Sequence, residues 1–304
     1  MTMTDQHVQT PYRAFRVRVA RTTRLSASFV RVTFTGDDVR LLRADAPDQR
    51  IKVVLPAAGQ DRVEFDGGPG WYDAFKLSDP AHRPILRTYT IRAIRPDDDE
   101  VDVDFVLHGD SGPASGWVSG DPLGREIVLF APTHEYSGEV GGFEWKPPAH
   151  AVDLLLAADE TAVPAVAGIL ESLPADATGQ VFLEVPDASD AIELHRPANV
   201  RVTWLPRGAD TVAGAALVQA IRSAEIKTAA SVAESDPSFQ LDDIDVDRDI
   251  LWEVTEDNDI PFYAWIAGEA GAVKAIRRHL VNDRGIERKT ITFMGYWRLG
   301  KAEM

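Results

Sequence analysis

The 304-residue sequence contains no cysteine. This absence excludes disulfides, thiolate-bound metals, iron–sulfur clusters and cysteine nucleophiles. The seven histidines show no spacing typical of a metal site, so we expect no bound metal either. Any redox chemistry would therefore require a bound organic cofactor.

Long apolar runs are also missing. No stretch approaches the roughly 20 apolar residues that span a bilayer, and the first residues, MTMTDQHVQTPYRAF, lack the basic and apolar parts of a leader. We therefore expect a cytoplasmic protein with no stable membrane association.

Positive charge is scarce. The chain has 32 basic and 48 acidic residues, a net charge of −16 and a pI of about 4.8. Such a field repels nucleic acids and anionic lipid surfaces, so nucleic acid is not an expected partner.

The first half of the chain consists of short apolar runs that alternate with a period of two, separated by turn-rich pieces such as GDD, FDGGPG and RPDDDE. This pattern predicts β-strands without a long helix between them. We expect an antiparallel β-barrel over residues 1–140. Its predicted strands are FRVRVARTTRL (15–25), SFVRVTFTG (28–36), IKVVLP (51–56), LRTYTIRAI (86–94), VDVDFVLHG (101–109) and EIVLFAP (126–132).

From residue 151 the pattern changes to apolar strands that alternate with helical stretches. This βαβ series predicts a parallel α/β sheet over residues 151–304, which would bind a nucleotide outside the carboxyl ends of its strands. The boundary is predicted in the Gly/Pro-rich segment 137–150. The acidic stretch 226–260 has no clear period and is interpreted as a solvated insertion, although a docking role for it stays open.

The segment Arg87-Thr88-Tyr89-Thr90 lies on a predicted barrel strand. A flavin needs an aromatic or apolar wall for its ring, donors for its polar edge and a cation for its pyrophosphate, and these residue types supply all three. Alternate side chains of a strand share a face, so Arg87 and Tyr89 point one way and Thr88 and Thr90 the other. Taken alone, the tetrapeptide is equally typical of an amphipathic edge strand.

About twenty residues further on stands HGDSGPASGW (108–117). Its glycines permit close backbone approach, and Pro113 suits the first position of a helix. Ala114 and Ser115 would then present N–H groups at a helix N-terminus, as a pyrophosphate site requires. The alternative is a glycine-rich hairpin loop.

In the second domain, polar residues follow the predicted strands. Asp159 and Thr161 come after LLLAA, where Thr161 could face a flavin and a nicotinamide, and Asp159 could instead cap a helix. Gly268 and Glu269 follow a later strand. Arg207 follows VTWLP and is either a nucleotide contact or an ordinary surface arginine.

Five motifs in this order resemble the siderophore-interacting protein family: RTYT (87–90), DFVLHGDSGPASGW (104–117), LLLAADETAVPA (154–165), WIAGEAGAVKAIRRHL (265–280) and GYWRLG (295–300). The resemblance implies an FAD-binding barrel followed by a Rossmann-like NAD(P)H-binding domain, as in the wider ferredoxin-reductase-like group. The implied FAD contacts are Arg87, Thr88, Tyr89, Thr90, His108, Gly109, Gly112, Ala114, Ser115, Thr161 and Trp297. The implied nicotinamide-nucleotide contacts are Asp159, Thr161, Arg207, Gly268 and Glu269.

The resemblance also implies a basic pocket for an anionic ferric siderophore. Lys52 and Arg298 match two of its cations. Where relatives carry a third, this chain reads Ala131-Pro132-Thr133-His134. Either His134 substitutes as a partial charge, or the substrate is less anionic than usual.

The implied function is reduction of a ferric siderophore by FAD, with NAD(P)H or ferredoxin as electron donor and release of Fe²⁺. Two alternatives stay open. One is a flavin-dependent reductase that passes electrons to a protein or a quinone, and the other is a protein that binds a siderophore without turnover.

Overall fold

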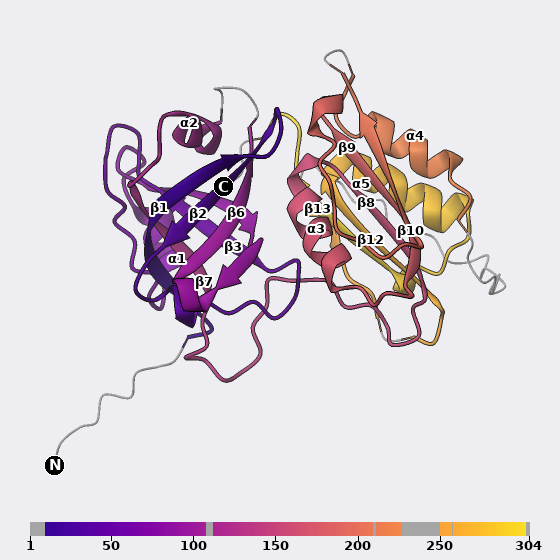
Figure 1. The fold of residues 1–304 in the computed structure, drawn as a ribbon, viewed down its shortest axis with the longest axis horizontal. Coiled ribbons are helices and arrows are strands. Elements are labelled where there is room, and N and C mark those ends of the chain that lie inside the picture. Colours follow the sequence, from indigo (N-terminus) through magenta and orange to yellow (C-terminus); the bar gives the residue numbers. More distant parts are fainter. Residues whose placement is uncertain (1–9, 108–111, 209–210, 227–249, 257, 302–304) are drawn as a thin grey trace. The chain divides into compact units, whose positions relative to one another are not determined.

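The computed structural model describes residues 10–107, 112–208, 211–226, 250–256 and 258–301. It divides into two compact units (Figure 1). Of the described residues, the first comprises those up to Arg24 together with Val30–Phe143. The second comprises Leu25–Phe29 and the described residues from Glu144 onward.

The first unit is a seven-stranded sheet in the order β4-β3-β7-β1-β2-β6-β5. The pairs β1–β2, β1–β7, β3–β7, β3–β4 and β5–β6 are antiparallel. The strands are β1 (Tyr12–Arg24), β2 (Phe29–Thr35), β3 (Arg50–Leu55), β4 (Ile85–Thr90), β5 (Ala93–Arg95), β6 (Glu100–Val106) and β7 (Glu126–Pro132). Each apolar run that predicted a strand forms one, and 86–94 forms two.

The sheet curls so that β4 returns toward β6. The Arg92 N–H donates to the Asp102 carbonyl at 2.9 Å, and the rings of Tyr89 and Phe105 lie 4.4 Å apart. The predicted antiparallel barrel is therefore confirmed. Its interior contains alternate residues of the strands, because side chains of a strand alternate between the two faces.

A short helix, α2 (Pro113–Ser119), packs its apolar side into this interior. The Trp117 ring is stacked on Phe34, with centroids 6.5 Å apart. The helix begins at Pro113, as predicted, because proline suits a first position where the missing N–H costs nothing.

The outer face of the barrel carries a second, smaller apolar cluster. Val54, Leu86, Val128 and Phe130 form its base. The helix α1 (Trp71–Leu77) covers it, and the ring of Trp71 lies 4.9 Å from Phe130. The sequence pattern had not predicted α1, because none of its residues is fully buried and it has no apolar period of its own.

The second unit is a six-stranded sheet in the order β10-β9-β8-β12-β13-β11. Its first five strands pair in parallel, and β11 (Trp252–Glu253) pairs with β13 antiparallel. The parallel strands are β8 (Asp153–Ala158), β9 (Thr178–Val185), β10 (Val200–Pro206), β12 (Phe262–Glu269) and β13 (Ile291–Trp297). The strand order reverses between β8 and β12, and open α/β sheets bind their ligands at such a point.

Three helices cover this sheet. Figure 1 shows α3 (Val163–Ser172) on one side and α4 (Ala215–Ser223) and α5 (Ala270–Arg278) on the other. Leu217 of α4 and Val273 of α5 pack on Leu155 and Ile266. The predicted combination of an antiparallel barrel and a Rossmann-like parallel α/β domain is confirmed.

Most of the acidic stretch 226–260 lies outside the described residues. At its C-terminal end the expectation of a solvated insertion is wrong, because Leu251 is 1% exposed in the core and Trp252 begins β11. Strand β11 lies at the antiparallel edge of the sheet and has only two residues, which are too few to show a period in the sequence.

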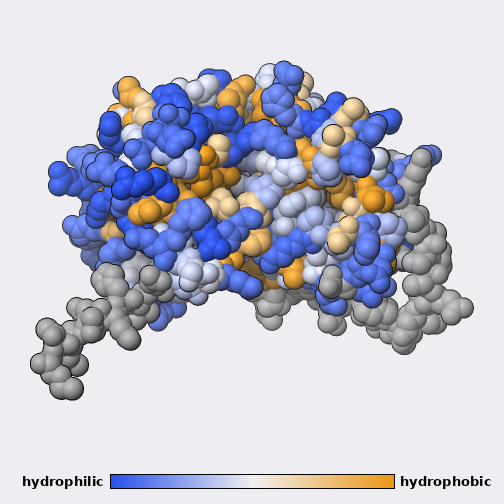
Figure 2. Space-filling view, turned by 60° about the horizontal axis from the view of Figure 1, so that its bottom comes forward, coloured by the Kyte–Doolittle hydropathy of each residue, from blue (hydrophilic) through white to orange (hydrophobic). Residues whose placement is uncertain are grey.

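No helix in the described ranges has both the length and the apolar content needed to cross a membrane. On the face shown in Figure 2, hydrophilic residues predominate and hydrophobic ones form separate patches.

Candidate functional site

The four residues of the RTYT segment end strand β4 in the first unit. Tyr89 is half-buried against the barrel interior, Thr88 is exposed, and Thr90 is buried. The Arg87 guanidinium donates to the Leu86 carbonyl at 2.8 Å. Among the described residues no carboxylate forms an ion pair with Arg87, whereas Arg13, Arg21 and Arg95 of the same unit all have such partners. An arginine without a carboxylate suits a phosphate ligand.

Lys52 lies directly opposite Thr88 in the register of β3 and β4. Its ammonium donates to the Thr88 hydroxyl at 2.7 Å. Because paired residues of an antiparallel ladder share a face, Lys52 lies on the opposite face of the sheet from Arg87 and Tyr89. The predicted substrate cation and the predicted flavin contacts therefore flank the same edge strand.

The predicted pyrophosphate loop is described only in part, since His108 and Gly109 lie outside the described residues. Gly112 precedes α2, and its carbonyl accepts from Gly116 N at 2.8 Å. Ala114 and Ser115 occupy the first turn, where backbone N–H groups have no acceptor within the helix. Both residues are buried, and the Ser115 hydroxyl donates to the Val106 carbonyl at 3.3 Å.

In the second unit, Asp159 follows β8 at the point where the strand order reverses. It is 1% exposed. One carboxylate oxygen accepts from the backbone N–H of Thr161 at 2.9 Å and from the Thr161 hydroxyl. The other accepts from Glu269 N and from Trp297 Nε1, both at 2.7 Å. Asp159 therefore joins the carboxyl ends of β8, β12 and β13.

The position of the Asp159 carboxylate explains why residue 268 is a glycine. Its φ is 147°, and a Cβ built on it would lie 2.6 Å from Asp159 Oδ2. Only glycine combines this backbone conformation with so close an approach. Burial, followed by the charge of neighbouring Glu160, raises the pKa of Asp159 to about 7, against the hydrogen bonds from Thr161 and Trp297, which lower it.

Arg207 follows β10, as predicted, but its guanidinium is engaged by two buried carboxylates. It forms a two-pronged ion pair with Glu160 and lies 3.5 Å from Glu184. Glu184 in turn accepts from Gly214 N at 2.6 Å and from Leu217 N at 2.8 Å, at the start of α4. The predicted contact of Arg207 with a nucleotide stays a prediction.

The role of Glu184 was missed in the sequence. Its signal is a single acid within the apolar run VFLEVP, where burial demands partners.

The remaining predicted residues lie at the ends of strands. The Glu269 side chain caps α5 by accepting from Ala272 N at 2.8 Å. Trp297 ends β13, and Arg298 follows it and is half-buried. His134 follows β7 and is exposed.

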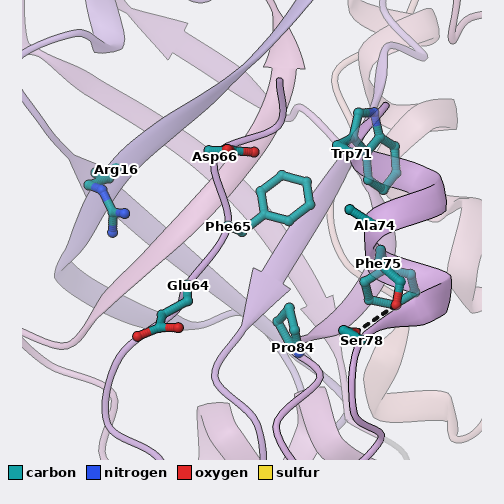
Figure 3. Close-up of a pocket in the computed structure, with 9 residues that line it drawn as sticks. All are labelled: Arg16, Glu64, Phe65, Asp66, Trp71, Ala74, Phe75, Ser78 and Pro84. Atoms are coloured by element: carbon teal, nitrogen blue, oxygen red, sulfur yellow. Dashed lines mark hydrogen bonds between the residues drawn. The ribbon is translucent and has the colours of Figure 1, made fainter. Parts of the chain in front are cut away.

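A groove of about 420 Å³ opens on the outer face of the first unit (Figure 3). Three aromatic rings, Phe65, Trp71 and Phe75, line it together with Pro84. Arg16, Glu64 and Asp66 add charges of both signs. None of the residues predicted from the sequence for a site lines this groove. Nearby on α1, Tyr72 and Leu77 are exposed.

Within the described parts of the chain, no three acidic or histidine side chains form a group that could hold a metal ion.

The sequence matches two family models. Residues 18–136 match the siderophore-interacting FAD-binding domain, and residues 151–300 match the siderophore-interacting protein model. The chain belongs to the siderophore-interacting protein family.

Individual members of the family align over most of the chain. It is 30% identical over 282 residues to the ferric vibriobactin reductase ViuB of Vibrio cholerae, which covers 92% of this chain and 87% of ViuB. It is 32% identical over 300 residues to the protein Rv2895c of Mycobacterium tuberculosis, an alignment that covers 96% of this chain and 92% of Rv2895c. The structure of a siderophore utilization protein from T. fusca superposes with a TM-score of 0.70 and 27% identity, covering 97% and 96%.

The barrel of this siderophore-interacting protein fits the FAD that its family model implies. Arg87 offers a guanidinium that is not paired with a described carboxylate, and Tyr89 offers a ring held by its contact with Phe105. The first turn of α2 adds backbone N–H donors. These groups would hold the pyrophosphate and the ring system.

Proposed function

We propose that this protein is an FAD-dependent reductase that takes electrons from NAD(P)H and releases iron as Fe²⁺ from an imported ferric siderophore in the cytoplasm. The observation that carries the proposal is the β4 strand, where Arg87 has no described carboxylate partner and lies two residues from the half-buried Tyr89. The name of ViuB, a ferric vibriobactin reductase, supports the same activity.

FAD, when bound, couples a two-electron donor to single-electron acceptors. One NAD(P)H therefore supplies the electrons for two ferric ions. Fe²⁺ is the less charged and softer ion, so its binding to hard siderophore oxygens is weaker and the metal is released.

The protein's own residues have binding roles in this proposal. Arg87 holds the pyrophosphate, and Tyr89 orients the ring against the barrel. Lys52 and Arg298 attract the anionic chelate. Thr161, half-exposed at the carboxyl edge of the second sheet, lies where an α/β sheet binds a nucleotide.

The test is an anaerobic mixing experiment with the FAD-reconstituted protein. NADH or NADPH is added first, and the bleaching of the flavin absorbance is followed. A ferric siderophore is added next, and a ferrous chelator of high absorbance reports released Fe²⁺. We expect two Fe²⁺ for each NAD(P)H consumed.

Lys52→Ala should raise the apparent KM for an anionic siderophore and spare the rate of flavin reduction. Lys76→Ala is the control, since it removes an exposed cation of the same unit that belongs to no predicted site. A protein that does not bind FAD would be a siderophore-binding protein without turnover. A protein whose flavin is reduced but passes electrons only to another protein or to a quinone would support the alternative of a flavin-dependent reductase with a different acceptor.

A further inference from the structure

The four donors around Asp159 differ in one respect. Oδ2 faces the Glu269 N–H and the Trp297 Nε1–H, and neither group can accept a hydrogen bond. Oδ1 faces the Thr161 N–H and the Thr161 hydroxyl. The hydroxyl alone among these four can reverse its role from donor to acceptor.

The two protonation states of Asp159 therefore dictate two orientations of one hydroxyl. When Asp159 is ionised, Thr161 donates its hydrogen to Oδ1 and offers only lone pairs to its other side. When Asp159 is protonated, the proton must lie on Oδ1, because two N–H groups occupy Oδ2. Oδ1 then donates to the Thr161 oxygen, and the Thr161 hydrogen becomes available for another acceptor.

Among the described residues, Asp159 forms no ion pair, and the charge of Arg207 acts on it without a direct contact. Glu160, which raises the pKa of Asp159, is paired with Arg207, and Glu184 shares that arginine. The Glu269 carboxylate accepts from Ala272 N and Leu299 N. Burial within this frame of hydrogen bonds raises the pKa of Asp159 to about 7.

We propose that Asp159 is a positioning residue that acts through Thr161, turning the Thr161 hydroxyl from acceptor to donor toward a ligand at the carboxyl edge of the α/β sheet. The ligand is a dinucleotide, whose phosphate and carboxamide oxygens are acceptors, and in this respect the inference rests on the proposed function. Asp159 itself does not touch the ligand. Acidification through neutrality supplies one extra donor to the bound dinucleotide.

The experiment compares the full-length wild-type protein with Thr161→Val, which removes the hydroxyl, and Thr161→Ser, which keeps it. The probes are NADH and NADPH, titrated at pH 6, 7 and 8. For wild type and Thr161→Ser we expect the Kd to rise roughly fivefold to tenfold from pH 6 to 8, the effect of one hydrogen bond. For Thr161→Val we expect a Kd that is close to the wild-type value at pH 8 and does not change with pH. A Thr161→Val protein with the wild-type pH profile would overturn the proposal.

A second measurement needs no ligand. The ¹³C shift of the Asp159 carboxyl, assigned with Asp159→Asn, reports its titration directly. Because the Thr161 hydroxyl lowers the pKa of Asp159, Thr161→Val should raise the midpoint and Thr161→Ser should leave it unchanged. Unchanged midpoints in both variants would overturn the proposal.

The two measurements separate this inference from the proposed function. If neither NADH nor NADPH binds the wild-type protein at any pH, the proposed electron donor is wrong, and the dinucleotide part of the inference fails with it. The carboxyl titration then still decides whether Asp159 controls the Thr161 hydroxyl.

Discussion

Each unit of the protein buries more than one aspartate, and Asp102 of the barrel and Asp159 of the α/β unit differ in pKa. Asp102 of the barrel accepts two hydrogen bonds of 2.7 Å from Arg95 and one of 2.6 Å from the Thr33 hydroxyl. Burial opposes its ionisation, but these partners outweigh it and hold the pKa of Asp102 below its ordinary value. Among the described residues, the donors to Asp159 of the α/β unit are uncharged, and burial raises its pKa to about 7.

The difference shows what a buried carboxylate needs. Hydrogen bonds alone fix the geometry of Asp159 but do not compensate for the lost solvation of its charge. A guanidinium does both for Asp102. The barrel can supply such cations because side chains at alternate positions of its strands share a face. Arginines of β2 and β5 therefore lie on the same outer face as the carboxylates of β6 and pair with them. At the carboxyl edge of the parallel sheet, Arg207 forms its ion pairs with Glu160 and Glu184.

The largest expected effect concerns Arg207, the half-buried arginine that pairs with two buried carboxylates of the α/β unit. Arg207→Ala leaves Glu160 and Glu184 buried without their cation, and we expect a loss of roughly 3–5 kcal/mol of unfolding free energy. Arg21→Ala is the control in the barrel. Its pair with Glu100 is half-exposed, and Glu100 keeps its second partner Arg95, so we expect little loss of unfolding free energy. Urea melts of both variants measure these losses. Equal losses would break the comparison between the units.

Unlike Arg207→Ala, Arg87→Ala should leave the stability of the protein nearly unchanged and lower its affinity for FAD. Arg87 has no carboxylate partner among the described residues, so the apoprotein should melt within about 0.5 kcal/mol of wild type. The affinity for FAD should fall roughly tenfold to a hundredfold, as expected for a lost charged hydrogen bond. Fluorescence titration with FAD measures the affinity, and Arg18→Ala on β1 is the control. A collapsed apoprotein would make Arg87 a structural residue.

Gly268→Ala tests how tightly Asp159 joins the strand ends. The new methyl group would meet Asp159 Oδ2, and we expect about 1–3 kcal/mol of destabilisation beyond that of the control. Gly208→Ala is that control, since Gly208 also has a positive φ but no atom within 4 Å of a Cβ. Similar losses in the two variants would show that the carboxylate moves away at little cost.

The two units should also differ in the pH dependence of their stability. The pKa of Asp159 is raised on folding, so its contribution to stability is present below its ordinary pKa and is lost as the pH rises to about 7. Between pH 5 and 7 the Tm should fall by about 2–4 °C for each kcal/mol lost. Asp159→Asn should flatten this slope, and Asp102→Asn should keep it. A slope that survives in Asp159→Asn belongs to another group.

For Asp102 the effect of pH on stability has the opposite sign. Its pKa is lowered on folding, so its contribution is present above its ordinary pKa and is lost as the pH falls through the lowered value. Wild type should therefore lose stability in acid through the barrel, and Asp102→Asn should be less sensitive to acid.

The order of the strands along the chain and the positions of the predicted site segments could be predicted from local sequence. Alternation in 15–25 or 126–132 predicts strands because a half-buried strand needs a period of two, and β1 and β7 lie there. Pro113 likewise predicted the start of α2, since its effect on the backbone is local. Helix α1 escaped prediction because its residues cover the outer face of the barrel without burying a periodic stripe.

The sequence by itself determined the two fold types, the β4 segment with Arg87 and Tyr89, and the strand ends where Asp159, Thr161 and Glu269 stand, because each depends on residues close in the chain. Only the tertiary structure decided what those side chains meet. Arg207 is 47 residues from Glu160, and Trp297 is 138 residues from Asp159. The sheet order brings them together, and the balance of burial against those partners sets their charge.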